Sequence, residues 1–467
     1  MRYESQKVSY YYFAFAGLVF FLQLLFGLVG ALQYFKPDLF LNFMPFNVTR
    51  TIHINTLVVW LLMGFMGATY YIVPEEADSE LYSLNLARFQ FWLLSIGAII
   101  VVLGYLFDGV TSHRFNVEFL GSGIFNEGRE YIEAPRWVDI VIIIGVLVFL
   151  FNVVMTTLKA KRVTNTLGVL LAGLVGLAIM YLPGVVFQPN ISKDQFWWWW
   201  VVHYWVEGTW EVIGGAVLAF MLMKLTGVRR EVVEKWMFVE VGLVLGTGIW
   251  GMGHHYFWIG TPSYWLWIGS IWSAMEPVPL LIMVWDAFRT TRETRTPIAN
   301  KPALYWTVGH ALLNFIGAGL FGVVHTLAPI NKWTHGTQVT PAHGHLAFYG
   351  AYVMLVISMA YIALPNLAGV KDYDINRGMK AFWWMTISMS LMALDLMGAG
   401  IVQVYMERMA GIDYTTVKMT YNQLFFILRF LFGLTFLWGA IYFFLDLIKL
   451  QPALATRAVS EEIRAMA

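Results

Sequence analysis

The stretch VVHYWVEGTWEV (residues 201–212) carries three ionisable side chains in an otherwise apolar and aromatic segment. His203, Glu207 and Glu211 are spaced four residues apart, so on a helix all three lie along one face. The four residues before the stretch, 197–200, are all tryptophan. A carboxylate in a lipid bilayer costs at least about 2.5–3.5 kcal/mol. Two carboxylates and a histidine therefore predict a buried site, with partners for them elsewhere in the chain.

The composition indicates that lipid surrounds most of the chain. Of 467 residues, 59% are hydrophobic, 17% aromatic and only 13% charged, whereas about 25% are charged in a typical soluble chain. The net charge is +1, and no basic tract indicates nucleic-acid binding. The absence of cysteine excludes disulfides, thiolate metal sites, iron–sulfur clusters and covalent c-type haem within this chain. Any metal must therefore be held by histidine, carboxylate or other oxygen ligands.

Apolar runs long enough to cross about 30 Å of hydrocarbon predict an all-α integral membrane protein with twelve transmembrane helices. The runs are residues 11–34, 52–74, 88–110, 137–158, 164–189, 196–224, 236–259, 261–288, 301–326, 342–364, 378–405 and 421–448. We expect the first run to be a retained helix and not a cleaved signal. No linker divides the chain, so we expect one transmembrane catalytic domain over residues 1–467.

Lysine and arginine indicate the orientation of these spans. They gather in alternate connections, at residues 159–162, 224–235, 289–295 and 371–380, and in the tail after residue 449. Positive residues mark cytoplasmic loops, so we expect both termini on the cytoplasmic side of a bacterial plasma membrane. The longest outer connection, about residues 111–136, is also the most polar.

Six of the histidines inside predicted spans lie near the outer end of their span and are the candidate ligands. They are His53, His203, His254, His255, His343 and His345. At 1.5 Å per residue they share one depth, within roughly 10 Å of the outer boundary. Any one alone could be a satisfied polar residue in a helix interface. Six at one depth indicate a functional site.

The local spacing sorts these histidines by geometry. His254 and His255 are about 100° apart on a helix, so they can converge on one metal ion but cannot sandwich a flat macrocycle. His343 and His345 are about 200° apart and point to opposite faces, so one helix could bind a haem on each side. His53 stands alone and suits the second axial position of one haem.

This set resembles the haem–copper oxidase superfamily, whose central subunit has twelve spans and six such histidines in this order. The resemblance covers essentially the whole chain. It implies that His53 and His345 are the axial ligands of a low-spin haem b. It further implies that His343 is the proximal ligand of a high-spin haem b3. His203, His254 and His255 would then bind the metal facing that haem.

The residue at position 207 indicates the branch of the superfamily. Oxygen reductases of the superfamily carry a tyrosine crosslinked to a copper ligand. The common oxidases have it where this chain has Glu207, and the cbb3-type oxidases where it has Gly248. A carboxylate beside three imidazoles is a harder donor set that suits non-haem iron better than copper. Glu207 is therefore the expected fourth ligand.

The segments WVVHYWVEGTWE, GHH and PAHGH resemble the catalytic large subunit of the bacterial nitric oxide reductases. The quinol-dependent branch carries an N-terminal extension that this sequence lacks, so the resemblance is to the cytochrome c-dependent branch. It implies the reaction 2 NO + 2 e⁻ + 2 H⁺ → N₂O + H₂O. Electrons would come from a small membrane-anchored c-type cytochrome subunit, through the low-spin haem b, to the haem b3 and the non-haem iron.

Two intramembrane acids are candidates for proton delivery. Glu211 lies one helical turn beyond Glu207, and Glu276 lies in SAMEPVPL beside Pro277, where a broken helix can direct a carboxylate into a cavity. A hydrogen bond that only holds a metal ligand or a helix in place is the alternative for each. The resemblance implies protons from the outer, periplasmic side and no pumping. The inner half of the sixth span, VIGGAVLAFMLM, agrees because it contains no acid or base.

Four further residues have weaker candidate roles. In the outer loop the resemblance implies a calcium ion that bridges haem propionates, and GREYIEAP favours Glu130 as its ligand and Glu133 for proton uptake. Arg50 and His335 could pair with haem propionates. A solvated loop or an ordinary interfacial residue is the alternative for each.

Two other functions remain open from the sequence. A terminal oxidase would reduce O₂ at the same kind of site, although Glu207 and Gly248 argue against it. A secondary transporter would use intramembrane histidine and glutamate as a proton relay and would show no haem absorption. His113, His310, His325 and Asp395 have no assigned role.

Overall fold

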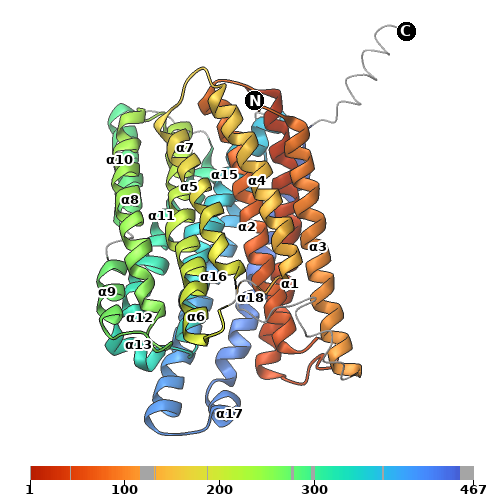
Figure 1. Cartoon of the computed structure of the whole chain (residues 1–467), viewed down its shortest axis with the longest axis vertical. Helices are drawn as coiled ribbons and strands as arrows, with labels where there is room; N and C mark the ends of the chain where they lie inside the picture. Colours follow the sequence, from red (N-terminus) through yellow and green to blue (C-terminus); the bar gives the residue numbers. More distant parts are fainter. Residues whose placement is uncertain are drawn as a thin grey trace.

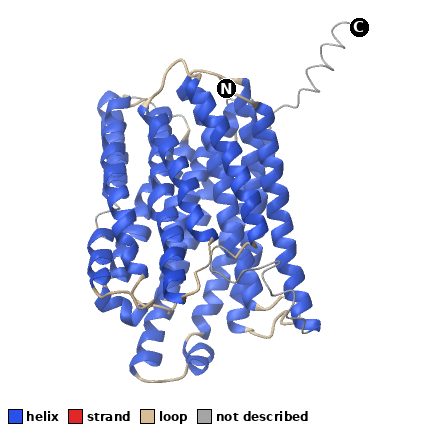
Figure 2. Ribbon diagram, viewed as in Figure 1, coloured by secondary structure: helices blue, strands red, loops and turns tan. Residues whose placement is uncertain are grey.

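The chain folds into a bundle of long helices that run side by side (Figures 1 and 2). The computed structural model describes residues 2–42, 44–115, 131, 133–186, 188–274, 278–295, 300–370 and 373–452. Every regular element among these residues is helical. The predicted all-α class is therefore confirmed.

Twelve spans follow one another along the chain. The first five are α1 (Val8–Phe35), α2 (Phe46–Ala77), α3 (Leu84–Phe115), α4 (Arg136–Leu158) and α5 (Asn165–Tyr181). The next four are α6 with α7 (Ile191–Tyr204 and Glu211–Thr226), α8 (Arg230–Trp250), α9 with α10 (Tyr264–Ser273 and Val278–Thr294), and α11 with α12 (Lys301–Leu313 and Phe321–Thr326). The last three are α14 with α15 (Val339–Phe348 and Met354–Ala368), α16 (Ile375–Gln403) and α18 (Gln423–Lys449), and the short helices α13 (Ala328–Thr334) and α17 (Tyr414–Thr416) lie in connections.

The span count agrees with the prediction, with one span less apolar than the others. By length and composition 11 helical segments of the described chain can cross a membrane. The twelfth, α8, carries Glu231, Glu234, Lys235 and Glu240 and packs between α7 and α10. It begins six residues before the predicted boundary and ends at Trp250. The residues after it, Gly251–His255, tighten into a 3-10 helix.

The most enclosed spans are the ones that carry the key histidines. Of the most apolar window of each span, 78% is buried in α2, 78% in α6 with α7 and 89% in α14 with α15, against 22% in α18. Spans at the periphery, such as α3, present side chains like Trp92 and Leu103 outward. His53, His203, His343 and His345 therefore lie on the three central spans, where burial excludes both lipid and water.

The start of α1 and the end of α18 meet at one end of the bundle. The Tyr10 hydroxyl of α1 donates to the carbonyl of Leu447, near the end of α18, at 3.3 Å. Figure 1 shows α6, α9, α12 and α13 toward the opposite end of the bundle from the N-terminus. The histidine-bearing helix ends and the first residues of the chain thus lie at opposite ends, as the sequence predicts.

Ion pairs tie three spans together at the end of the bundle near the N-terminus. Lys224 of α7 pairs with Glu75 of α2. Arg230 of α8 pairs with Glu76 of α2 at 2.9 Å and with Glu234 at 3.2 Å. Since Glu76 and Glu234 are buried, these carboxylates depend on Arg230 to offset their loss of hydration.

We predict that Arg230→Ala destabilises the protein by about 1–3 kcal/mol, because it leaves two buried carboxylates without their cation. The measurement is the thermal unfolding midpoint in detergent. Lys235→Ala is the matched control, since Lys235 is 60% exposed and lies 3.9 Å from Asp286. Equal midpoints for the two variants would show that the ion pair at Arg230 contributes no more than an exposed one.

Candidate active site

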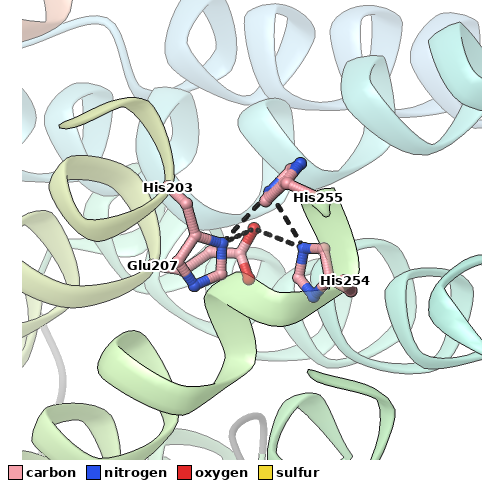
Figure 3. Close-up of side chains that lie close together, drawn as sticks. All are labelled: His203, Glu207, His254 and His255. Carbon is pink, nitrogen blue, oxygen red and sulfur yellow. Dashed lines mark hydrogen bonds and ion pairs between the residues drawn. The ribbon is translucent and has the colours of Figure 1, made fainter. Parts of the chain in front are cut away.

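Three histidines and one glutamate converge in the interior of the bundle (Figure 3). Their ligand atoms all lie within 4.8 Å of one another. The His254 and His255 Nε2 atoms are 2.9 Å apart, and His255 Nε2 is 3.1 Å from His203 Nδ1. Glu207 Oε1 lies 3.5 Å from His203 Nδ1 and 3.9 Å from His254 Nε2. The structure therefore brings together the four residues that the sequence singled out as a metal-ligand set.

The spacing of these donor atoms fits a single metal ion. A tetrahedral ion bound at about 2.0–2.1 Å holds its ligand atoms about 3.3 Å apart, within the range seen here. A neutral imidazole can donate a lone pair to a metal ion. Without a metal ion, three clustered imidazoles would leave polar nitrogen atoms facing one another in a buried site. The donor set therefore fits a divalent transition metal.

A π-helix positions Glu207. The helix that begins as α6 changes to a π-helix at Trp205–Trp210 before it continues as α7, and Glu207 has non-helical backbone angles, φ −93° and ψ 21°. π-helical turns insert one residue, rotate the side chains that follow, and occur frequently at functional sites. Here the Tyr352 hydroxyl donates to the carbonyl of Val206 at 2.5 Å. A neighbouring central span thus satisfies a carbonyl of the irregular turn.

Packing orients the two adjacent histidines. His254 Nδ1 lies 2.7 Å from Ser273 Oγ, which leaves Nε2 for the metal. The His255 ring stacks on Trp199, with 4.1 Å between centroids and 9° between planes. Gly269 permits the close approach of α9, since a Cβ there would lie 2.1 Å from the backbone nitrogen of His254.

His53 and His345 face each other at the separation that a bis-histidine haem requires. Their ring centroids are 6.3 Å apart and their planes differ by 26°. Two metal–nitrogen bonds of about 2 Å plus the half-width of each ring give a centroid distance of about 6 Å. Each ring is bonded through Nδ1 to a carbonyl, at 2.8 Å to Gln23 and 2.7 Å to Pro341. Both Nε2 atoms therefore remain for an iron.

His343 points to a different neighbour from His345, as their spacing predicts. Its Nδ1 lies 3.0 Å from the carbonyl of Gly317, which belongs to a second π-helix, Asn314–Leu320. A π-helix shifts the hydrogen-bond ladder and makes such a carbonyl available. A Cβ at Gly322 of α12 would lie 3.2 Å from the His343 ring. His345 therefore faces α2, whereas His343 faces the π-helix and α12.

The candidate acids differ in how far the structure describes them. Glu211 begins α7, one turn beyond Glu207. Glu133 is 4% exposed and its Oε2 accepts a hydrogen bond from Asn55, two residues after His53, at 2.7 Å. Burial raises the pKa of the Glu133 carboxyl above 4.5, and the bond from Asn55 opposes that shift. Glu276 and Glu130 lie outside the described residues.

Arg50 and His335 occupy different surroundings. Arg50, one turn before His53, is half-buried and close enough to Glu133 to oppose the rise in the pKa of its carboxyl. His335 lies in an exposed turn, where its ring is 5.3 Å from that of Trp258 and its carbonyl accepts from Arg408 at 2.6 Å. Of the two, Arg50 lies on the helix that carries His53.

Two intramembrane charged residues were not predicted from the sequence. Arg429 of α18 lies 4.6 Å above the Tyr34 ring, and its buried Nη1 has no hydrogen-bond partner. Glu240 of α8 is buried with both carboxylate oxygens unpartnered. Each interrupts an apolar run, in FFILRFLF and WMFVEVGLVL, and that interruption was the available signal.

The histidines without a role mostly have local partners. His325 lies between the hydroxyls of Thr334 and Thr340, at 3.0 and 3.2 Å. His310 Nδ1 lies 2.8 Å from the carbonyl of Gly350. The side chain of His113 lies outside the described residues. Neither His310 nor His325 belongs to the metal cluster.

Comparison with known proteins agrees with this geometry. Residues 7–435 match the family model "Cytochrome C and Quinol oxidase polypeptide I". The chain is 45% identical over 449 residues to a nitric oxide reductase subunit of Stutzerimonas stutzeri, covering 94% of each protein. It is 25% identical to a cytochrome c oxidase subunit 1 homologue of Agrobacterium tumefaciens, over 94% of this chain and 82% of that one. In fold it resembles a haem–copper terminal oxidase, with TM-score 0.76 and 14% identity over 96% of this chain and 84% of the other.

The structure contains a cluster of three imidazoles and a facing histidine pair in a multi-pass helical membrane protein. The similarity to a nitric oxide reductase subunit extends along nearly the whole chain. The chain belongs to the cytochrome c and quinol oxidase polypeptide I family of haem–copper oxidases, as a homologue of a nitric oxide reductase subunit.

Proposed function

We propose that this chain is the catalytic large subunit of a cytochrome c-dependent nitric oxide reductase, which converts two NO to N₂O and water. The observation that carries the proposal is Glu207, whose carboxylate lies 3.5 Å from His203 Nδ1 in the metal cluster. An oxygen donor at this position favours iron over copper. The 45% identity to a nitric oxide reductase subunit supports the same activity.

The residues divide among three metal groups. His203, Glu207, His254 and His255 would hold the non-haem iron, and His343 would be the proximal ligand of haem b3. His53 and His345 would hold the low-spin haem b, since their ring separation of 6.3 Å suits an iron between them. Arg50 and Arg429 offer positive charge to haem propionates, and His335 is the remaining candidate for that role.

The proposed electron path begins outside this chain. With no cysteine to attach a c-type haem, the protein needs a partner that carries one, and a small membrane-anchored c-type cytochrome fits. The positive loops favour cytoplasmic termini, which would put the metal cluster toward the periplasmic side of a bacterial plasma membrane. Electrons would therefore enter from the periplasmic face through the low-spin haem b.

The protein's own groups would orient the substrates and move protons. Two metal ions side by side supply Lewis-acid and redox chemistry that favours joining two NO molecules through nitrogen. Around them, Trp199, Trp205 and the surrounding apolar side chains exclude water. Glu211, one turn beyond Glu207, would donate a proton to oxygen as negative charge builds there. Glu276 would be a second donor.

Protons would enter from the periplasmic side. Glu133 is the proposed uptake group, because it is buried beside the His53 helix and burial raises the pKa of its carboxyl. Glu130, in the same loop, would be a ligand of a calcium ion.

We predict that Glu207→Ala loses the non-haem iron and keeps both haems b, with NO turnover reduced at least about 100-fold, because ligand loss weakens metal binding strongly. The measurements are metal content, reduced-minus-oxidised haem spectra and NO consumption. Glu231→Ala, an exposed acid at the start of α8, is the control and should keep all three metals. Copper in the wild-type protein, together with fast O₂ reduction, would instead make it a terminal oxidase.

A second prediction concerns Glu133→Gln and pH. The folded-state pKa of Glu133 is raised above 4.5 by burial. The carboxyl therefore contributes full stability below about pH 4.5 and loses that contribution as the pH rises through its folded pKa. Glutamine can still accept from Asn55 but does not ionise. The unfolding midpoint of Glu133→Gln should thus rise relative to wild type as the pH increases.

The same variant tests proton uptake. NO turnover in wild type should fall as the pH rises through the raised pKa, and Glu133→Gln should be slow at every pH. Asp139→Asn is a control, because Asp139 is buried on α4 but accepts from Tyr181. Wild-type turnover in Glu133→Gln would remove Glu133 from the proton path.

A further inference from the structure

Glu240 is a buried acid in the middle of a membrane span. It is 1% exposed, and neither carboxylate oxygen has a hydrogen-bond partner. An ionised carboxylate in this position would cost at least about 2.5–3.5 kcal/mol, and within the described chain no ion pair offsets that cost. A protonated carboxyl is the form that this surrounding tolerates.

The carboxyl of Glu240 lies directly on the helix that carries Glu207 and Glu211. A Cβ at Gly215 of α7 would lie 2.7 Å from Glu240 Oε2 and 3.2 Å from Oε1. Gly215 and Glu211 are four residues apart on α7, so they share one helix face, and Glu207 precedes Glu211 in the π-helical turn. Each step along this face is about 6 Å. Glu240 therefore extends the row of carboxyls that starts at the metal cluster.

Among the described groups, Glu211 is the charged neighbour that acts on Glu240. Three other charged groups described on the packed helices have their own partners. On α7, Lys224 pairs with Glu75. On α8, Glu234 pairs with Arg230, and Asp286 of α10 accepts from Trp236 at 2.9 Å. The cluster residues Glu207, His203, His254 and His255 bond among themselves or to Ser273.

The described residues of α7 and α8 beyond Glu240 are apolar toward the opposite end of the bundle. On its own face of α8 the residues toward the start of the helix are Met237 and Val233, both fully buried. On α7 the residues beyond Gly215 are buried and apolar as far as Leu222. Among the described residues, Glu211 is therefore the group from which Glu240 would receive a proton.

We propose that Glu240 is a proton-storing carboxylic acid that exchanges its proton with Glu211. The inference rests on the proposed function, in which each N₂O consumes two protons. After Glu211 has donated its proton, the Glu240 O–H bond breaks and the proton forms a new O–H bond on the Glu211 carboxylate, directly or through one water. Glu240 is left ionised until a proton from the uptake side returns through Glu211. The pair would thus supply a second proton without waiting for uptake from bulk water.

The test is infrared spectroscopy of the purified holoenzyme in its resting state, without NO. Wild type should show the carbonyl stretch of a protonated carboxylic acid that shifts in D₂O, and Glu240→Gln should lose it. Gly215→Ala should shift this band, because its new Cβ forces the carboxyl to move. Glu234→Gln is the matched control, since Glu234 is a buried but ion-paired acid of the same helix, and it should leave the band unchanged.

A kinetic measurement then tests whether Glu240 stores a proton that is used in turnover. Glu240→Gln should slow N₂O formation in the first turnover by about tenfold, less than the roughly 100- to 10,000-fold expected for loss of a direct proton donor, with haem spectra unchanged. An unaltered infrared band in Glu240→Gln, or an unaltered first turnover, would overturn the proposal. If the band disappears but wild type reduces no NO, the proposed function fails while the protonated state of Glu240 stands.

Discussion

The free-energy cost of placing a carboxylate inside a membrane bundle determines how this site is built. Glu207 lies on a central span, among three imidazoles whose donor atoms are within 4.8 Å of one another. Without a cation this group would combine an unpaired acid with three crowded nitrogens. A divalent metal offsets both costs at once, because it neutralises the carboxylate and uses every lone pair.

Irregular helix turns arrange the ligands around that centre. The π-helix at Trp205–Trp210 sets the direction of Glu207, and the π-helix at Asn314–Leu320 supplies the carbonyl that orients His343. The 3-10 turn Gly251–His255 brings two adjacent histidines to one point. Regular α-helices could not direct these side chains in the same way, so the backbone departs from the α-helix where the chemistry requires it.

Much of this arrangement could be predicted from sequence because membrane burial makes ionisable residues conspicuous. The spacing of His203 and Glu207 and the shared depth of the six histidines indicated a buried functional site, and the resemblance to the oxidase superfamily assigned the metal ligands and the facing pair. Hydropathy predicted a span at α8 although this helix carries charged residues, but the predicted first and last residues of that span were wrong. The π-helices could not be predicted, because one inserted residue leaves the hydrophobic period unchanged and is stabilised by a distant partner such as Tyr352. Glu240 and Arg429 were missed because only packing shows what an isolated charge faces.

The central claim is that an oxygen ligand selects iron at the histidine cluster. X-ray absorption at the iron and copper edges of the purified wild-type protein tests it most directly. We expect one non-haem iron per chain, with three nitrogen atoms and at least one oxygen atom bound directly to it, in addition to the haem irons. Copper bound by nitrogen ligands alone, with iron present only as haem, would contradict the claim.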